Sequence, residues 1–137
     1  MSDRQIEIYE AVNAGQRALE SLYDAREELQ RARNWGIADL LGGGMFITYA
    51  KHNKINQAKN CIARAQQEMN RFGRQINDVD AFAGVDLGIS DFLVFADYFF
   101  DGFVADFMVQ QKINEAAGQV DEAIRRVEQL LARLKRM

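Results

Sequence analysis

The sequence contains no proline, and its 137 residues include only one cysteine, one histidine and one tryptophan. Proline ends or kinks helices, so its absence leaves helices free to run long. The single cysteine, Cys61, has no second cysteine with which to form an intramolecular disulfide, and the first twelve residues lack the basic and apolar regions of a secretion signal. We therefore expect a protein of the reducing cytoplasm.

Long uncharged apolar runs are also missing. The most apolar stretch, residues 89–109, is interrupted by Asp91, Asp97, Asp101 and Asp106. Each carboxylate would cost roughly 2.5–3.5 kcal/mol at the centre of a bilayer, so no transmembrane segment is expected. The formal net charge of −3 argues against a general phosphate-binding surface, and we expect no nucleic-acid partner.

Three segments carry apolar or small residues at alternating steps of three and four, which is the spacing of a coiled-coil seam. The seams consist of Ile8, Ala11, Gly15, Ala18, Leu22, Ala25, Leu29 and Ala32; of Ile55, Ala58, Ile62, Ala65, Met69, Phe72, Ile76 and Val79; and of Ile113, Ala116, Val120, Ala123, Val127, Leu130, Leu134 and Met137. They predict an all-α fold in one domain, residues 1–137. The expected architecture is an elongated, antiparallel, coiled-coil-like bundle of three long helices, with one short buried helix near residues 91–100.

The first two seams have equal lengths on either side of Gly43 and Gly44. Folding the chain there brings Ala32 opposite Ile55 and Ile8 opposite Val79, which predicts an antiparallel helical hairpin. The third helix could pack back on this hairpin or pair with a second subunit, and closure within one chain is favoured by the chain length. The residues assigned to the turn and to its later equivalent are Trp35, Gly42, Gly43, Gly44 and Gly102.

Residues 39–58 also resemble residues 97–116, with six identities in twenty positions. This similarity predicts an internal repeat with units at about 36–79 and 94–137. Two similar helix starts shaped by the same packing are the alternative.

Asp39 and Asp97 occupy equivalent positions in this repeat, and Asp101 lies one helical turn after Asp97. Carboxylates that face one another inside a helical bundle can hold metal ions, so these residues and His52 form a candidate metal or catalytic site. The Glu-x-x-His pairs of di-iron bundles are absent. The alternative is that each aspartate caps a helix start or accepts hydrogen bonds from exposed amides around the glycine turn and from the Trp35 indole N–H.

Aromatic residues are concentrated between residues 92 and 107. They could line a pocket for an apolar ligand, although aromatic residues at helical spacing usually form core. The cluster contains Phe92, Phe95, Tyr98, Phe99, Phe100, Phe103 and Phe107. Cys61 lies beside the seam residue Ile62, which favours a packing role over a nucleophilic one.

Two segments, WGIADLLGGG from Trp35 and FADYFFDG from Phe95, are similar to segments of a family of uncharacterised bacterial proteins that is common in Gram-positive lineages. The similarity covers about 36–58 and 92–114. It implies a bacterial cytoplasmic protein, and it brings no activity, substrate or catalytic residue with it.

The sequence as a whole favours a non-enzymatic structural or protein-interaction bundle, with no cofactor and with a second copy of itself, as a homodimer, or another protein as partner. The two alternatives are a carboxylate-based metal-binding protein or enzyme, and a carrier of an apolar ligand.

Overall fold

The computed structural model describes the backbone of residues 2–42, 45–82, 88–101 and 109–137, and the side chains of residues 2–34, 57–82, 88–97 and 113–137. Every element in these ranges is helical, which confirms the all-α prediction. The elements are α1 (Asp3–Gly42), α2 (Met45–Asn77), the short 3-10 helix η1 (Asp80–Phe82), α3 (Ile89–Asp101) and α4 (Val109–Lys135).

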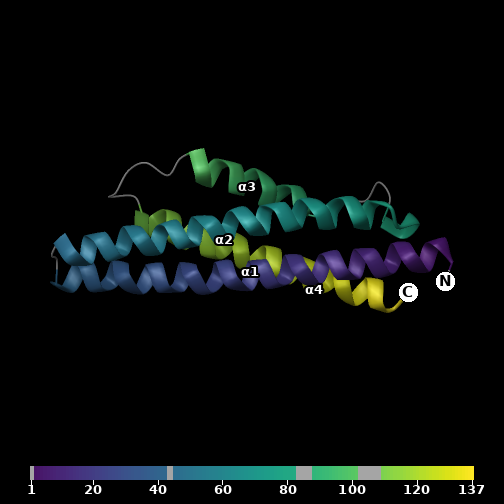
Figure 1. The fold of residues 1–137 in the computed structure, drawn as a ribbon, viewed down its shortest axis with the longest axis horizontal. Helices are drawn as coiled ribbons and strands as arrows, with labels where there is room; N and C mark the ends of the chain where they lie inside the picture. The colour runs from purple at the N-terminus through teal and green to yellow at the C-terminus, as the bar shows by residue number, and fades with distance from the viewer. Residues whose placement is uncertain (1, 43–44, 83–87, 102–108) are drawn as a thin grey trace.

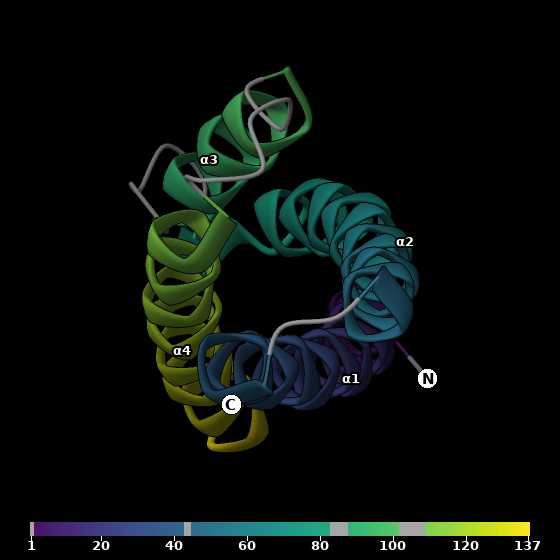
Figure 2. The same ribbon diagram turned by 90° about the vertical axis from the view of Figure 1, so that its left-hand side faces the viewer.

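The helices form an elongated bundle in which each helix runs opposite to its neighbours (Figure 1). Contacts join α1 to α2, α2 to α3, α3 to α4, and α4 back to α1. Seen from one end, the four helices therefore follow one another around the bundle (Figure 2). The last long helix packs on the hairpin of its own chain, which is the single-chain closure favoured by the sequence.

The hairpin of α1 and α2 has the register that the seams predict. Gly15 packs against Phe72, which places this contact seven residues inward on each helix from the predicted pair Ile8 and Val79. Gly15 also contacts Leu131 of α4, since a Cβ built on Gly15 would lie 2.7 Å from Leu131 Cδ2 and 2.9 Å from Phe72 Cε1. Three helices therefore meet closely at a residue that has no side chain.

The apolar seams form the core. Among the seam residues with described side chains, all are buried except Ile8, which is partly buried, and Met137, which is 43 % exposed. The largest fully buried side chains include Phe72, Phe82 and Leu22. Burying a side chain of this size stabilises the fold by about 1.5–3 kcal/mol, so the seams account for much of the stability of the bundle.

The start of α1 has the paired hydrogen bonds of a capping box. The Gln5 N–H donates to Ser2 Oγ at 3.2 Å, and the Ser2 N–H donates to Gln5 Oε1 at 2.9 Å. Two backbone donors that have no partner inside the helix are satisfied in this way, which fixes where α1 begins.

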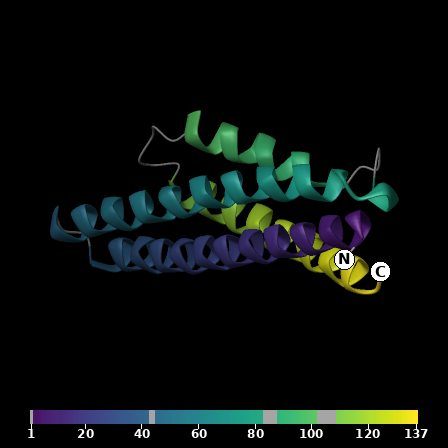
Figure 3. The same cartoon turned by 45° about the vertical axis from the view of Figure 1, so that its right-hand side comes forward.

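The prediction of a short buried helix is wrong in one respect. α3 buries Ile89, Phe92 and Ala96 along one face, but Val94 on the opposite face is 68 % exposed. The reason is that α3 lies on the outside of the bundle, over α2 and α4, with no described helix beyond it (Figure 3).

The assignment of Trp35 to the turn is also wrong, because α1 continues through Trp35 and ends at Gly42. A helix tolerates an isolated glycine at a cost of about 1 kcal/mol, so Gly36 does not stop it. Gly42 is the last residue of α1, whereas Gly43 and Gly44 lie outside the described residues, as does Gly102. None of the described helices is both long enough and apolar enough to span a membrane.

Candidate functional site

Asp97 is the one proposed metal ligand whose side chain is described. It is exposed on α3, and its Oδ1 accepts a hydrogen bond of 2.7 Å from Gln66 Nε2 of α2. The carboxylate thus joins two helices at the surface. Asp97 lies in the second half of α3 and does not cap a helix start, and its donor is a side-chain amide of α2, which the sequence did not predict.

The other proposed ligands lie in helices whose side chains are not described at these positions. Asp39 is in the last turn of α1, His52 is in the first half of α2, and Asp101 is the final residue of α3. The described residues contain no group of three histidine, cysteine, aspartate or glutamate side chains that could hold a metal ion. The four-residue metal site therefore stays a prediction.

The helical backbone also bears on whether Asp39 and Asp97 could share a site. Asp97 contacts Gln66, which lies two residues from Arg64, and Arg64 Nη1 is 3.9 Å from Asp24 Oδ2 of α1. Asp39 follows Asp24 by fifteen residues, which is about 22 Å along a helix at 1.5 Å per residue. A site that used both aspartates would have to span this distance.

Cys61 lies at the flank of the interface between α1 and α2, partly buried against the core. Burial raises the pKa of the Cys61 thiol, and the negative charge of Glu28 raises that pKa further. Glu28 is itself 15 % exposed and pairs with Arg31 through Oε1, while its Oε2 is buried without a hydrogen-bond partner among the described residues. A raised pKa disfavours the thiolate, so this surrounding suits a packed thiol and not a nucleophile.

Alkylation of Cys61 by iodoacetamide is therefore expected to be slower in the native protein than in the urea-unfolded chain at the same pH between 7 and 9. A raised pKa lowers the thiolate fraction throughout this range. Glu28→Gln should accelerate the native reaction, because it removes the larger of the two glutamate contributions to the pKa. Glu27→Gln is the matched control, since Glu27 also pairs with Arg31 but contributes least to the shift. Equal rates in both variants would contradict the assigned cause.

The described part of the aromatic segment contributes to packing. Phe92 is buried, and its ring centroid lies 6.2 Å from that of the partly buried Phe95. A cavity of about 40 Å³ lies beside Phe92, and polar groups of Gln119 and Arg126 are among its lining. Ligand pockets usually have volumes of 300–1,000 Å³, so this cavity is too small for an apolar ligand. The other members of the aromatic cluster have side chains outside the described residues.

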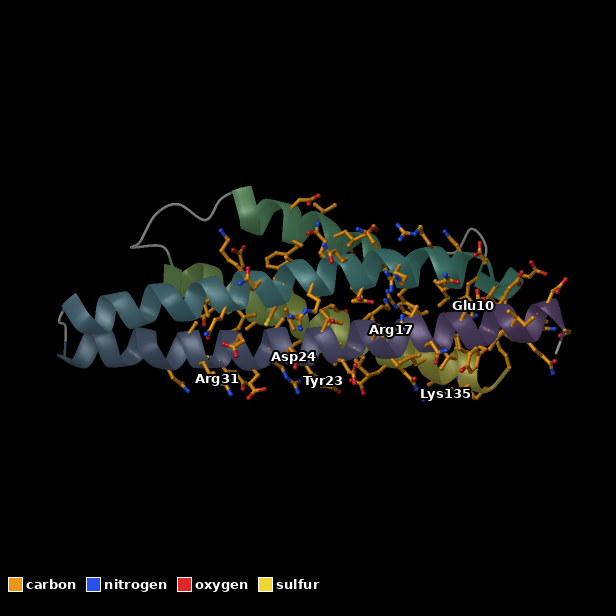
Figure 4. The ribbon with its side chains drawn as sticks, in the orientation of Figure 1. Glu10, Arg17, Tyr23, Asp24, Arg31 and Lys135 are labelled. Atoms are coloured by element: carbon orange, nitrogen blue, oxygen red, sulfur yellow. The ribbon has the colours of Figure 1, made fainter. Side chains whose placement is uncertain are left out.

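A wider hollow lies on the outer surface, between α1 and α4. Its volume is about 550 Å³, it is open to solvent, and Ile124 lies in it between charged side chains. Arg26 Nη1 approaches Asp121 Oδ1 at 3.7 Å across this junction, and Tyr23 donates from its hydroxyl to Glu128 Oε1 at 3.3 Å. Figure 4 labels Tyr23 on α1. These residues belong to no motif in the sequence, and the only signal there is that Tyr23 follows Tyr9 by two heptads.

Comparison with family models, with curated proteins and with solved structures gives no match for this chain. The similarity of the Trp35 and Phe95 segments to a bacterial family stays a prediction. What the chain does has to be argued from its own surface.

Proposed function

We propose that this chain is a non-enzymatic structural or protein-interaction bundle that presents its charged outer faces to a partner protein. The observation that carries the proposal is the division between interior and surface: Ser21 is the only buried polar residue among those with described side chains, and the rest of the buried set is apolar. Catalytic and cofactor sites need polar groups that converge in a sheltered cleft. In the described part of this bundle, the polar groups lie outside, along helices long enough to form extended contacts.

Two finer features belong to the same proposal. The first feature is the coiled-coil spacing of the seams. The second is that six seam residues of α2 and the six residues that follow them by 58 positions in α4 are all buried. These pairs are Ala58 and Ala116, Ile62 and Val120, Ala65 and Ala123, Met69 and Val127, Phe72 and Leu130, and Ile76 and Leu134. This correspondence supports an internal repeat. A cytoplasmic location, which is favoured by the unpaired Cys61, completes the proposal.

The proposal predicts that the intact chain either self-associates or binds a particular protein in a bacterial lysate. Light scattering would measure the mass in solution, and affinity capture followed by cross-linking mass spectrometry would locate the contacts. Arg71 and Arg74 are exposed on α2, and a variant with Arg71→Glu and Arg74→Glu reverses the charge of this outer face. A partner that binds this face should be lost from the variant. A monomer from which no cross-linked partner is recovered would contradict the proposal.

The metal and ligand alternatives have separate tests. Elemental analysis that found a stoichiometric metal in the purified protein would favour the site of Asp39, His52, Asp97 and Asp101. Native mass spectrometry that found a co-purified small molecule would favour the apolar carrier.

A further inference from the structure

The outermost face of α4 carries seven exposed residues at alternating steps of three and four. They are Glu115, Gly118, Glu122, Arg125, Gln129, Ala132 and Arg136, and we call them the α4 stripe. These positions lie opposite the core residues of α4, such as Val120 and Val127, and α4 lies on the outside of the bundle (Figure 2). The α4 stripe has the spacing that packs two helices together. All seven of its residues are exposed in the described chain, and Glu122 lies at the edge of the cavity that α4 shares with α3.

The α4 stripe is symmetric about Arg125 in the positions of its small residues, and its two ends carry opposite charges. Gly118 lies seven residues before Arg125 and Ala132 lies seven residues after it, so the two small residues are at equal distances from it. Glu115 is ten residues before Arg125 and Arg136 is eleven after it, so an acid at one end corresponds to a base at the other. A second α4 in the antiparallel direction, related by a twofold axis near Arg125, would place unlike charges together at both ends.

From this symmetry we propose that two copies of the protein associate through their α4 stripes, antiparallel, about a twofold axis at Arg125. This inference rests on the proposed interaction function, and it names the partner and the surface. Glu115 of each copy faces Arg136 of the other, and Gly118 faces Ala132 of the other. The small pair permits a close approach of the two helices, since a Cβ added at Gly118 would have no heavy atom within 4 Å in the single chain.

The charges at the centre of the α4 stripe are also compatible with this pairing. Arg125 forms an ion pair and two hydrogen bonds with Glu122 of its own helix, and these lower the pKa of Glu122 and raise that of Arg125. Each copy therefore brings a neutral pair to the axis, not two unbalanced arginines. The hollow between α1 and α4, with Ile124 in it, lies beside Arg125, Gln129 and Ala132 and adds recessed surface next to the contact.

The helix dipole does not account for the acids in the α4 stripe. Favourable interactions of acids with a helix N-terminus fade within the first turn. α4 begins at Val109, so Glu115 and Glu122 lie six and thirteen residues into the helix. Glu122 is paired with Arg125 of its own helix, and the position of Glu115 fits an antiparallel partner better than a dipole.

Disulfide trapping tests the geometry in the intact chain, with Cys61→Ala as background. Gly118→Cys and Ala132→Cys would be oxidised separately and as an equal mixture. In the proposed dimer the mixture forms disulfide-linked dimers and neither variant does so alone, because a disulfide needs Cα atoms within about 7 Å. Gln67→Cys, at an exposed position of α2, is the control that stays unlinked. Linkage of each variant alone as efficiently as in the mixture, or no linkage in the mixture, overturns the proposal.

Charge exchange gives an independent readout by light scattering or sedimentation equilibrium. Glu115→Arg and Arg136→Glu are each expected to raise the dimer dissociation constant about tenfold, because each disturbs two symmetry-related ion pairs, and the double variant should restore it. Higher salt should also weaken the dimer. Circular dichroism should show unchanged helix content, since both residues are exposed.

Failure of this inference differs from failure of the proposed function. A monomer that still captures a protein through another face refutes the α4 pairing alone, as does a dimer in which the double variant is no tighter than the single variants. A monomer that captures nothing refutes both.

Discussion

Replacement of Phe72 by alanine is expected to lower the free energy of unfolding by about 3–5 kcal/mol. The Phe72 side chain is fully buried and lies where α1, α2 and α4 meet. Its ring packs against Gly15 on the side where a Cβ of that residue would lie. Removing the ring leaves a cavity among helices that cannot close it without shifting, so the lost burial and the cavity both contribute. Folded domains are stable by about 5–15 kcal/mol, so this one change should remove a large share of the total.

Urea denaturation followed by circular dichroism at 222 nm measures this effect. Phe72→Leu retains most of the apolar volume and should cost less than about 1.5 kcal/mol. Val94→Ala is the surface control, because Val94 is largely exposed on α3 and its truncation should change stability by no more than about 0.5 kcal/mol. Similar losses for Phe72→Ala and Val94→Ala would show that Phe72 is not at the centre of the core.

The sequence predicted the core of this bundle well because the information needed there is local and periodic. Steps of three and four place residues on one face of a helix whatever the helix packs against. Equal seam lengths then determined the hairpin register, which the contact between Gly15 and Phe72 bears out. The seam positions alone do not show which face of α1 packs against α4. The ion pair of Arg26 with Asp121 identifies this face.

Predictions of where a helix ends, of what covers it, and of which distant residues meet were less successful. The seam of α1 stops at Ala32, but the helix continues to Gly42, because hydrogen bonding within a helix does not require an apolar stripe. The all-round apolar composition of α3 suggested burial, yet only its face toward α2 and α4 is covered. The candidate site depended on a long-range meeting of Asp39 and Asp97, and no periodicity specifies such a contact. The hydrogen bond from Gln66 to Asp97 had no indication in the sequence.

Gly15→Leu is expected to destabilise the protein by about 1–3 kcal/mol, although leucine is the better helix former by up to about 1 kcal/mol. The first atom of the new side chain would already lie within 3 Å of both Leu131 and Phe72. Phe72 is a rigid, fully buried ring, so the helices themselves have to move apart to admit a leucine. The close approach of three helices at this position is thus the reason that a glycine is tolerated in the middle of α1.

Gly118→Leu is the matched comparison, because Gly118 also lies inside a long helix but has open space where a Cβ would be added. At this site only the helix propensity changes in the single chain, and unfolding should require up to about 1 kcal/mol more free energy. Both variants should be unfolded in urea at low protein concentration, so that association through α4 does not contribute. The two leucines should shift stability in opposite directions. If both were stabilising, α1, α2 and α4 could not pack as closely at Gly15 as the structure indicates.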